Sequence, residues 1–254
     1  MARVYIDAGH GGSDSGAVKY IVERDVNLVM ALACRDYLNA NGVSTKMSRT
    51  SNSTDTSIGS MAREANSWNA DLVISIHNNA GGGDGFEVYH TVGGGRGKTL
   101  AQNIEAEVKK IGQNSRGLKT RRDTDGTDYY GMIRLTDAPA VICEGVFVDN
   151  ATDVQIADTA DEQRAFGYAY ARGILKTLGI ADKGYKAAGF AATTGAFKVK
   201  VTIKDLYIRT GPGTSYGKKG FIKPGVYTIV ATQNGWGRLK SGAGWIYLAY
   251  AVRI

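Results

Sequence analysis

Two of the three histidines and one glutamate follow short apolar runs that are typical of buried strands. His10 lies in the Gly-rich run that follows residues 2–6, and His77 follows residues 72–76. Glu144 follows residues 140–143 in the same way. Because the carboxyl ends of parallel strands meet at one edge of a sheet, we expect these three side chains to converge there.

This set of side chains suits a metal-assisted hydrolase. Two neutral imidazoles and a carboxylate are a common three-ligand set for zinc that leaves a position for water. Glu23, at the start of a helical pattern, supplies a second carboxylate, so one glutamate can bind the metal and the other can act as a base.

These residues also allow a purely structural interpretation. A histidine in a glycine turn or at a strand end is often purely structural, whereas a carboxylate after an apolar strand needs a partner. The sequence contains no His-Glu-x-x-His stretch, and no serine lies in a strand-to-helix nucleophile elbow. The segment Gly9-His10-Gly11-Gly12 lacks the Lys-Ser/Thr of a phosphate loop, and its glycines do not fit the dinucleotide fingerprint.

The elements that must position these residues alternate along residues 1–180. Strand-like runs occupy residues 2–7, 44–48, 72–76, 86–90 and 140–143, and helical spacing of apolar residues occurs near 26–37, 100–111 and 166–178. Near-continuous apolar strands alternating with helices predict an α/β fold, with a mostly parallel sheet flanked by helices on both faces.

A second, smaller module is expected after residue 180. Residues 181–196 are rich in small residues and read as a linker, and residues 197–254 contain four or five short strand patterns, which predict a small all-β barrel. The net charge also differs between the two modules. Residues 181–254 carry twelve Lys and Arg against two Asp, whereas the rest of the chain is mildly acidic. Such charge indicates a different partner for each module.

Composition narrows the class of protein. The chain has 254 residues, of which 43% are hydrophobic and 22% charged, as in ordinary globular proteins. Its two cysteines, Cys34 and Cys143, lie in apolar runs and are expected to be buried thiols. No apolar run approaches the length of a membrane helix. The short apolar start before Asp7 does not match an export signal, so we expect synthesis in the cytoplasm.

Residues 3–178 resemble the zinc-dependent N-acetylmuramoyl-L-alanine amidases of the amidase-3 type. The resemblance rests on segments in the same order: DAGHGGSDSGA (7–17), ERDVNL (23–28), SRT (48–50), REAN (63–66), ADLVISIHNNA (70–80), GFEVY (85–89) and PAVICE (139–144). It implies that His10, Glu23 and His77 bind one zinc ion and that Glu144 is the catalytic carboxylate. It also implies cleavage of the amide between the lactyl group of N-acetylmuramic acid and L-alanine in peptidoglycan.

Some residues depart from the family pattern or match none of it. The family often has Glu-x-Gly-Phe where this chain has Glu144-Gly145-Val146-Phe147, and Ala where it has Asn78. His90 matches no ligand position and is expected to be structural or exposed. Arg49 and Arg63 are open to two interpretations, a contact to a substrate carboxylate or an ordinary packing or surface role.

The C-terminal module resembles the bacterial SH3-like domains of cell-wall enzymes. The matching segments are LYIRTGPGTSY (206–216), Gly220 with KPG (223–225), NGWGRL (234–239) and GWI (244–246). The resemblance implies binding to the cell wall. Six aromatic residues offer flat surfaces for this, and half of them are expected to pack inside the barrel: Tyr207, Tyr216, Trp236, Trp245, Tyr247 and Tyr250.

Together these features predict a peptidoglycan amidase, with catalytic residues 1–180, that uses zinc-activated water. The expected partners are peptidoglycan and anionic wall polymers, with no nucleic acid and no stable membrane insertion. The compact layout favours a bacteriophage endolysin that reaches the wall after a holin opens the membrane. The alternatives are a host autolysin for mother-cell lysis, a zinc peptidase acting within the wall peptide, and a wall-binding protein with a decayed enzyme domain.

Overall fold

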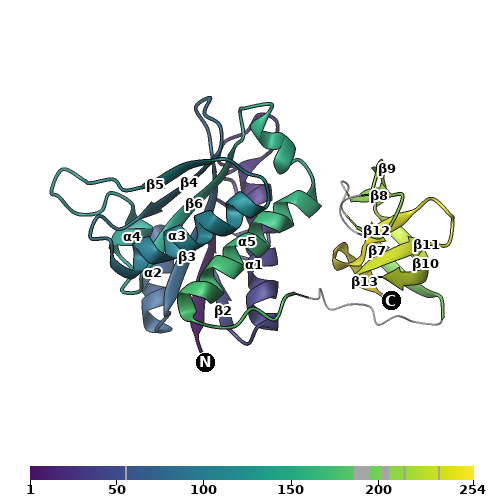
Figure 1. The fold of residues 1–254 in the computed structure, drawn as a ribbon, viewed down its shortest axis with the longest axis horizontal. Coiled ribbons are helices and arrows are strands. Elements are labelled where there is room, and N and C mark those ends of the chain that lie inside the picture. Colours follow the sequence, from purple (N-terminus) through teal and green to yellow (C-terminus); the bar gives the residue numbers. More distant parts are fainter. Residues whose placement is uncertain (55, 186–194, 202–205, 214–215, 234) are drawn as a thin grey trace. The chain divides into compact units, whose positions relative to one another are not determined.

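The computed structural model describes residues 1–54, 56–185, 195–201, 206–213, 216–233 and 235–254 (Figure 1). The chain divides into two compact units. The first contains Met1–Asp158 and Glu162–Gly184, and the second contains Thr159–Asp161 and Tyr185–Ile254. The first unit therefore ends slightly after the expected boundary at residue 180. Residues 186–194 of the expected linker lie outside the described residues.

The first unit is built on one mixed sheet. Its strands, in chain order, are β1 (Arg3–Ala8), β2 (Ser44–Met47), β3 (Leu72–Asn79), β4 (Phe86–His90), β5 (Ser115–Lys119) and β6 (Ala140–Phe147). They are arranged in the order β2-β1-β3-β6-β4-β5. All neighbouring pairs are parallel except β4 and β6, which are antiparallel. The predicted α/β class with a mostly parallel sheet is confirmed.

Helices cover both faces of this sheet: α1 (Glu23–Ala40), α2 (Ile58–Ser67), α3 (Gly95–Lys110), α4 (Gly131–Arg134) and α5 (Ala160–Leu178), with a 3-10 turn, η1 (Asp153–Ile156). On one face, Met61 of α2 and Met132 of α4 pack with Tyr5, Val73 and Ile142 from the strands. On the other face, α1 and α3 lie on the strands. Burial on both sides explains the near-continuous apolar strand patterns.

Two strands extend further at the edge that carries the site than the sequence predicts. We expected the strands to end before His77 and Glu144, but β3 continues to Asn79 and β6 to Phe147. Polar residues here are paired with one another across the strands, so a break in the apolar pattern does not end the strand.

Helices α2 and α4 and strand β5 were not predicted. With four and five residues, α4 and β5 are too short for a clear periodic pattern. In α2, by contrast, Ile58, Met61, Ala62 and Ala65 do follow helical spacing, which sequence reasoning missed.

The second unit is an all-antiparallel sheet over its described residues. Its strands are β7 (Phe197–Val201), β8 (Tyr207–Arg209), β9 (Lys218–Phe221), β10 (Gly225–Gln233), β11 (Trp236–Leu239), β12 (Trp245–Tyr247) and β13 (Ala251–Arg253), with the 3-10 turn η2 (Leu248–Tyr250). They run in the order β13-β7-β10-β11-β12-β8-β9. A small apolar core includes Val199, Ile229 and Ile246. The fold is all-β as predicted, with more strands than the four or five expected.

Two smaller expectations concern cysteines and membrane helices. Cys34 and Cys143 are buried free thiols, as predicted. Among the described residues, no helix combines the length and apolar character needed to cross a bilayer.

Candidate metal centre and its cleft

His10 is presented by a tight loop that follows β1. Its backbone takes the left-handed conformation, with φ of 63°, which is uncommon for a residue with a side chain. The loop closes through two backbone hydrogen bonds between Gly11 and Asp14, of 3.1 and 2.8 Å. Asp14 also fixes the imidazole, because its Oδ2 lies 2.7 Å from His10 Nδ1. The other ring nitrogen, Nε2, is left to face the cleft.

Glu23 begins α1 and is 4% exposed. The backbone N–H of Ala17 donates to its Oε2 at 2.9 Å, and the backbone N–H of Asn78 donates to its Oε1 at 3.1 Å. These two bonds hold the carboxylate between the first loop and β3. A buried carboxylate of this kind has a defined orientation before any ligand arrives.

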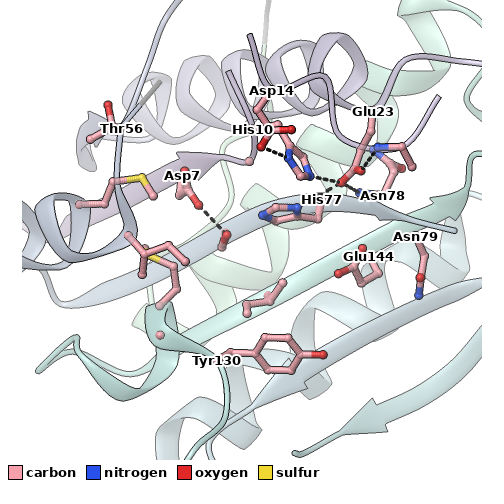
Figure 2. Close-up of a pocket in the computed structure, with 18 of the residues that line it drawn as sticks. Asp7, His10, Asp14, Glu23, Thr56, His77, Asn78, Asn79, Tyr130 and Glu144 are labelled. Atoms are coloured by element: carbon pink, nitrogen blue, oxygen red, sulfur yellow. Dashed lines mark hydrogen bonds and ion pairs between the residues drawn. The ribbon is translucent and has the colours of Figure 1, made fainter. Parts of the chain in front are cut away.

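His77 of β3 completes a cluster of three donors. The Nδ1 atom of His77 lies 3.1 Å from Glu23 Oε1, and the Nε2 atom of His10 lies at the same distance from that oxygen. One candidate ligand atom from each residue falls within 4.8 Å of the others. Figure 2 shows the two imidazoles and the carboxylate pointing toward one another from three separate elements. The sequence-predicted metal residues are thus brought together by the fold.

The cluster fits a zinc ion by its donor chemistry and by its packing. Two imidazole nitrogens and a carboxylate oxygen are ligands that zinc prefers. Glycines make room for them: a Cβ at Gly9 would lie 2.2 Å from the His77 ring, and a Cβ at Gly16 would lie 2.5 Å from Glu23 Oε2. Glycines at these two positions are therefore needed because any larger residue would collide with the donor side chains.

The pKa values show strong coupling within the cluster. The hydrogen bond to Glu23, with that to Asp14, raises the pKa of His10 to about 9 against the effect of burial. Burial alone would raise the pKa of Glu23, but hydrogen bonds from His10 and His77 outweigh it and hold the value well below the usual range. The carboxylate thus remains anionic and attracts a cation, whether a proton on a histidine or a metal ion.

Glu144 lies on the neighbouring strand and lines the same cleft. It is the direct cross-strand partner of His77 on one side and of Glu87 on the other. Burial raises its pKa to about 7, opposed by His77 and reinforced by Glu23 and Glu87. No protein hydrogen bond to its carboxylate occurs in the part of the chain that the structure describes. It can therefore accept a proton from a water molecule in the cleft.

The cleft itself has a volume of about 560 Å³ and continues beyond the donors. Ile58, Met61, Met132 and Ile142 give it an apolar wall, and Tyr130 lies across the opening from the imidazoles (Figure 2). This space is large enough for a small substrate group beside the metal cluster. An open cluster at the edge of a roomy cleft is the arrangement of a catalytic rather than a purely structural metal site.

The remaining candidate residues have structural positions. His90 is 6% exposed, and its Nδ1 bonds the carbonyl oxygen of Thr91, so the expected structural role fits. Arg49 is buried and donates to the carbonyl oxygens of Ala8, Gly9 and Arg24, which favours the packing interpretation. Arg63 is exposed on α2, bonds Ser60 and does not line the cleft.

Sequence reasoning missed the supporting polar groups. Asp14, four residues after His10, could have been noticed as a carboxylate partner for that imidazole. The buried side chain of Asn78 donates to Asn27 Oδ1 at 2.7 Å and accepts from the N–H of Val146 at 3.0 Å. A Cβ at Gly145 would come within 2.7 Å of its Oδ1. The two departures from the family pattern, Asn78 and Gly145, are therefore in contact.

Comparison with known proteins agrees with this geometry. Residues 4–176 match the N-acetylmuramoyl-L-alanine amidase family of the amidase-3 type. The chain belongs to this family.

Two relatives and one solved structure illustrate the match. The N-acetylmuramoyl-L-alanine amidase CwlM of Bacillus licheniformis is 34% identical over 211 residues, which span 81% of this chain and 79% of that one. The endolysin of Bacillus phage SPP1 is 33% identical over 190 residues, spanning 71% and 67%. The catalytic domain of the amidase CwlV from Bacillus (Paenibacillus) polymyxa var. colistinus superposes with a TM-score of 0.64 at 28% identity, covering 71% of this chain and all of that domain.

Proposed function

We propose that the first unit is a zinc-dependent amidase that cleaves the bond between the lactyl group of N-acetylmuramic acid and L-alanine in peptidoglycan. The observation that carries this proposal is the convergence of His10, Glu23 and His77 beside Glu144 at an open cleft. The family of the chain supports the choice of substrate. All four groups of the constellation are present, which argues against a decayed enzyme.

The residues of the chain have separate tasks in this proposal. His10 Nε2, Glu23 and His77 Nδ1 would hold zinc, which supplies an acidified water and an electrophile for the scissile carbonyl. Glu144 takes a proton from the attacking water and passes it to the departing amine of L-alanine. Asp14 binds His10 Nδ1 and so leaves Nε2 on the side of Glu23, where it would be free to hold the metal. The apolar wall with Ile58 and Met61 shelters the substrate next to these groups.

Product analysis of digested sacculi tests the reaction. We expect intact stem peptides with a free L-alanine amine and glycan strands without peptides. A chelator should abolish this release and added zinc should restore it. New ends within the peptide would instead identify a zinc peptidase, and unchanged release by protein proven free of metal would exclude zinc catalysis.

For the second unit we propose an SH3-like wall-binding domain. The segment order between residues 206 and 246 and the antiparallel sheet support it. Of the aromatic residues considered, Trp236 is buried and Tyr207 stacks on Phe221 at 4.2 Å, whereas Tyr216 is 47% exposed. Sedimentation with purified walls of the full chain carrying Glu144→Gln, compared with residues 1–184 carrying the same change, tests this role, and equal sedimentation of the two in low salt would contradict it.

We further propose that the chain acts in phage-induced lysis of a bacterial host. Similarity to a phage endolysin favours this role, while similarity to a bacterial amidase keeps a host autolysin as the alternative. Cells that make the protein in the cytoplasm should remain intact until the membrane is permeabilised, and should then lyse. Lysis without permeabilisation would contradict a holin-dependent enzyme.

A further inference from the structure

The second unit contains a groove of about 360 Å³ on its antiparallel sheet. Lys219 of β9, Arg238 of β11 and Lys240, just after β11, line it. Trp245 of β12 also lines the groove, directly opposite Arg238 across the two strands. Cross-strand partners point to the same side of a sheet, so the guanidinium and the indole are presented together.

The charge of this groove is uncompensated. Lys219, Arg238 and Lys240 are exposed, and none of them forms an ion pair within the described part of the chain. The residues that line the groove include no Asp or Glu. Residues 185–254 hold eleven Lys and Arg but only one acid, Asp205. Three cations gathered around a concave surface favour an anionic ligand, and the field of the whole segment draws such a ligand in.

The chemistry of the lining distinguishes between anionic ligands of the wall. A stem peptide carries amines as well as carboxylates, and a groove without acids offers nothing to its amines. A phosphodiester polymer carries one negative charge per repeat and no obligatory cation, and guanidinium groups bind phosphate oxygens in pairs. Trp245 is only partly buried and gives a polyol or sugar unit a flat apolar surface.

We propose that this groove binds a phosphodiester-linked polyol or sugar polymer of the cell wall. Its phosphates contact Lys219, Arg238 and Lys240, and the carbon skeleton between them lies on Trp245. This inference rests on the proposed wall-binding function and specifies its ligand. The groove is then the place where the positive charge of residues 185–254 contacts its ligand.

Calorimetric titration of the full chain with soluble poly(glycerol phosphate) tests the proposal. The Glu144→Gln background is used, since binding then needs no catalysis and a failure of the amidase proposal leaves the result interpretable. The variant K219Q/R238Q/K240Q should lose about tenfold or more in affinity, as expected for the loss of three exposed charge contacts. The variant K219R/K240R keeps the charge and should retain the affinity.

A charge-matched control separates the groove from the general field. Lys198, Lys200 and Lys223 are exposed in the same unit and do not line the groove. The variant K198Q/K200Q/K223Q loses the same charge and should change the affinity by less than about threefold. Equal losses in the two triple variants would overturn the proposal, with circular dichroism verifying that both are folded.

Competing ligands complete the test. A soluble muropeptide, which the cleft of the first unit can also bind, should bind the parent chain and K219Q/R238Q/K240Q equally well. A short DNA duplex should bind the parent chain more weakly than poly(glycerol phosphate) at the same ionic strength. Muropeptide affinity that falls in K219Q/R238Q/K240Q would assign the groove to the stem peptide. Equal binding of DNA would show attraction to any polyanion, and either result would contradict the proposed ligand.

Discussion

Glu23 is buried and Glu144 is partly buried at the cleft, and their surroundings give the two carboxylates opposite protonation behaviour. Glu23 accepts hydrogen bonds from two imidazoles and two backbone N–H groups, which keep its pKa well below the usual range. Burial without such donors raises the pKa of Glu144 to about 7. A permanently ionised group suits a metal ligand, and a group that titrates near neutral pH suits a proton shuttle.

The first prediction follows from the role of Glu144 as the base. Glu144→Gln keeps the shape of the side chain but removes the base, so turnover of peptidoglycan should fall about 100–10,000-fold. The variant should still fold and bind one zinc per chain, measured by atomic emission. Loss of zinc from this variant would mean that Glu144 is a ligand and would put the assignment of Glu23 in doubt.

A second prediction concerns pH. The base works only when Glu144 is deprotonated, so turnover should decline as the pH falls through its pKa. A bound cation lowers that pKa, which places the midpoint between the ordinary value of 4.5 and about 7. Zinc content measured at each pH separates this decline from metal loss. Full turnover at pH 4 with zinc retained would contradict the role of Glu144.

Asp14 gives a third prediction. Its carboxylate holds His10 Nδ1 at 2.7 Å, so Asp14→Asn should weaken zinc binding about 10–100-fold. Competition with a chelating dye measures this without any catalytic assay. Asp36→Asn is the matched control, because Asp36 pairs with Arg35 on α1 and does not line the cleft. Equal affinities in the two variants would show that Asp14 does not position the ligand.

At the scale of elements, the positions of His77 and Glu144 depend on strands β3 and β6 running past the apolar pattern. Sequence reasoning placed His10, Glu23, His77 and Glu144 at one sheet edge, because their positions follow apolar runs or open a helix. It could not reveal the hydrogen bonds of Asn78, because these link residues far apart in the chain. The short elements α4 and β5 could not be predicted for a related reason, because so few residues show no clear period and their stability comes from tertiary packing.

The contact between Asn78 and Gly145 gives a fourth prediction. Gly145→Ala would place a Cβ 2.7 Å from Asn78 Oδ1, so it should lower the free energy of unfolding by about 1–3 kcal/mol. In the Asn78→Ala background this cost should shrink, with a coupling of about 0.5 kcal/mol or more. Urea denaturation of the four proteins measures the cycle. Simple additivity would contradict the idea that these two departures from the family pattern depend on each other.

At the scale of the whole molecule, the two units differ in composition and chemistry. The candidate metal cluster and its cleft lie entirely in the first unit, and the excess of positive over negative side chains lies in the second. Residues 181–184 belong with the first unit for a physical reason. Tyr37 Oη on α1 donates to Asp182 at 2.8 Å, and the N–H of Lys183 donates to Asn41 Oδ1 at 2.8 Å. A truncation should therefore end at Gly184 rather than at residue 180.

The last prediction concerns this truncation. Residues 1–184 contain the complete site, so the fragment should fold and retain zinc. It should bind walls more weakly, because it lacks the raised local concentration that a tethered binding unit provides. Its activity on intact walls should therefore fall more than its activity on a small soluble muropeptide. Because exposed charges are screened within about 10 Å at 0.1 M salt, added salt should narrow the difference between the fragment and the full chain. A fragment that lyses walls as fast as the full chain, in low and high salt alike, would show that the second unit does not target the enzyme.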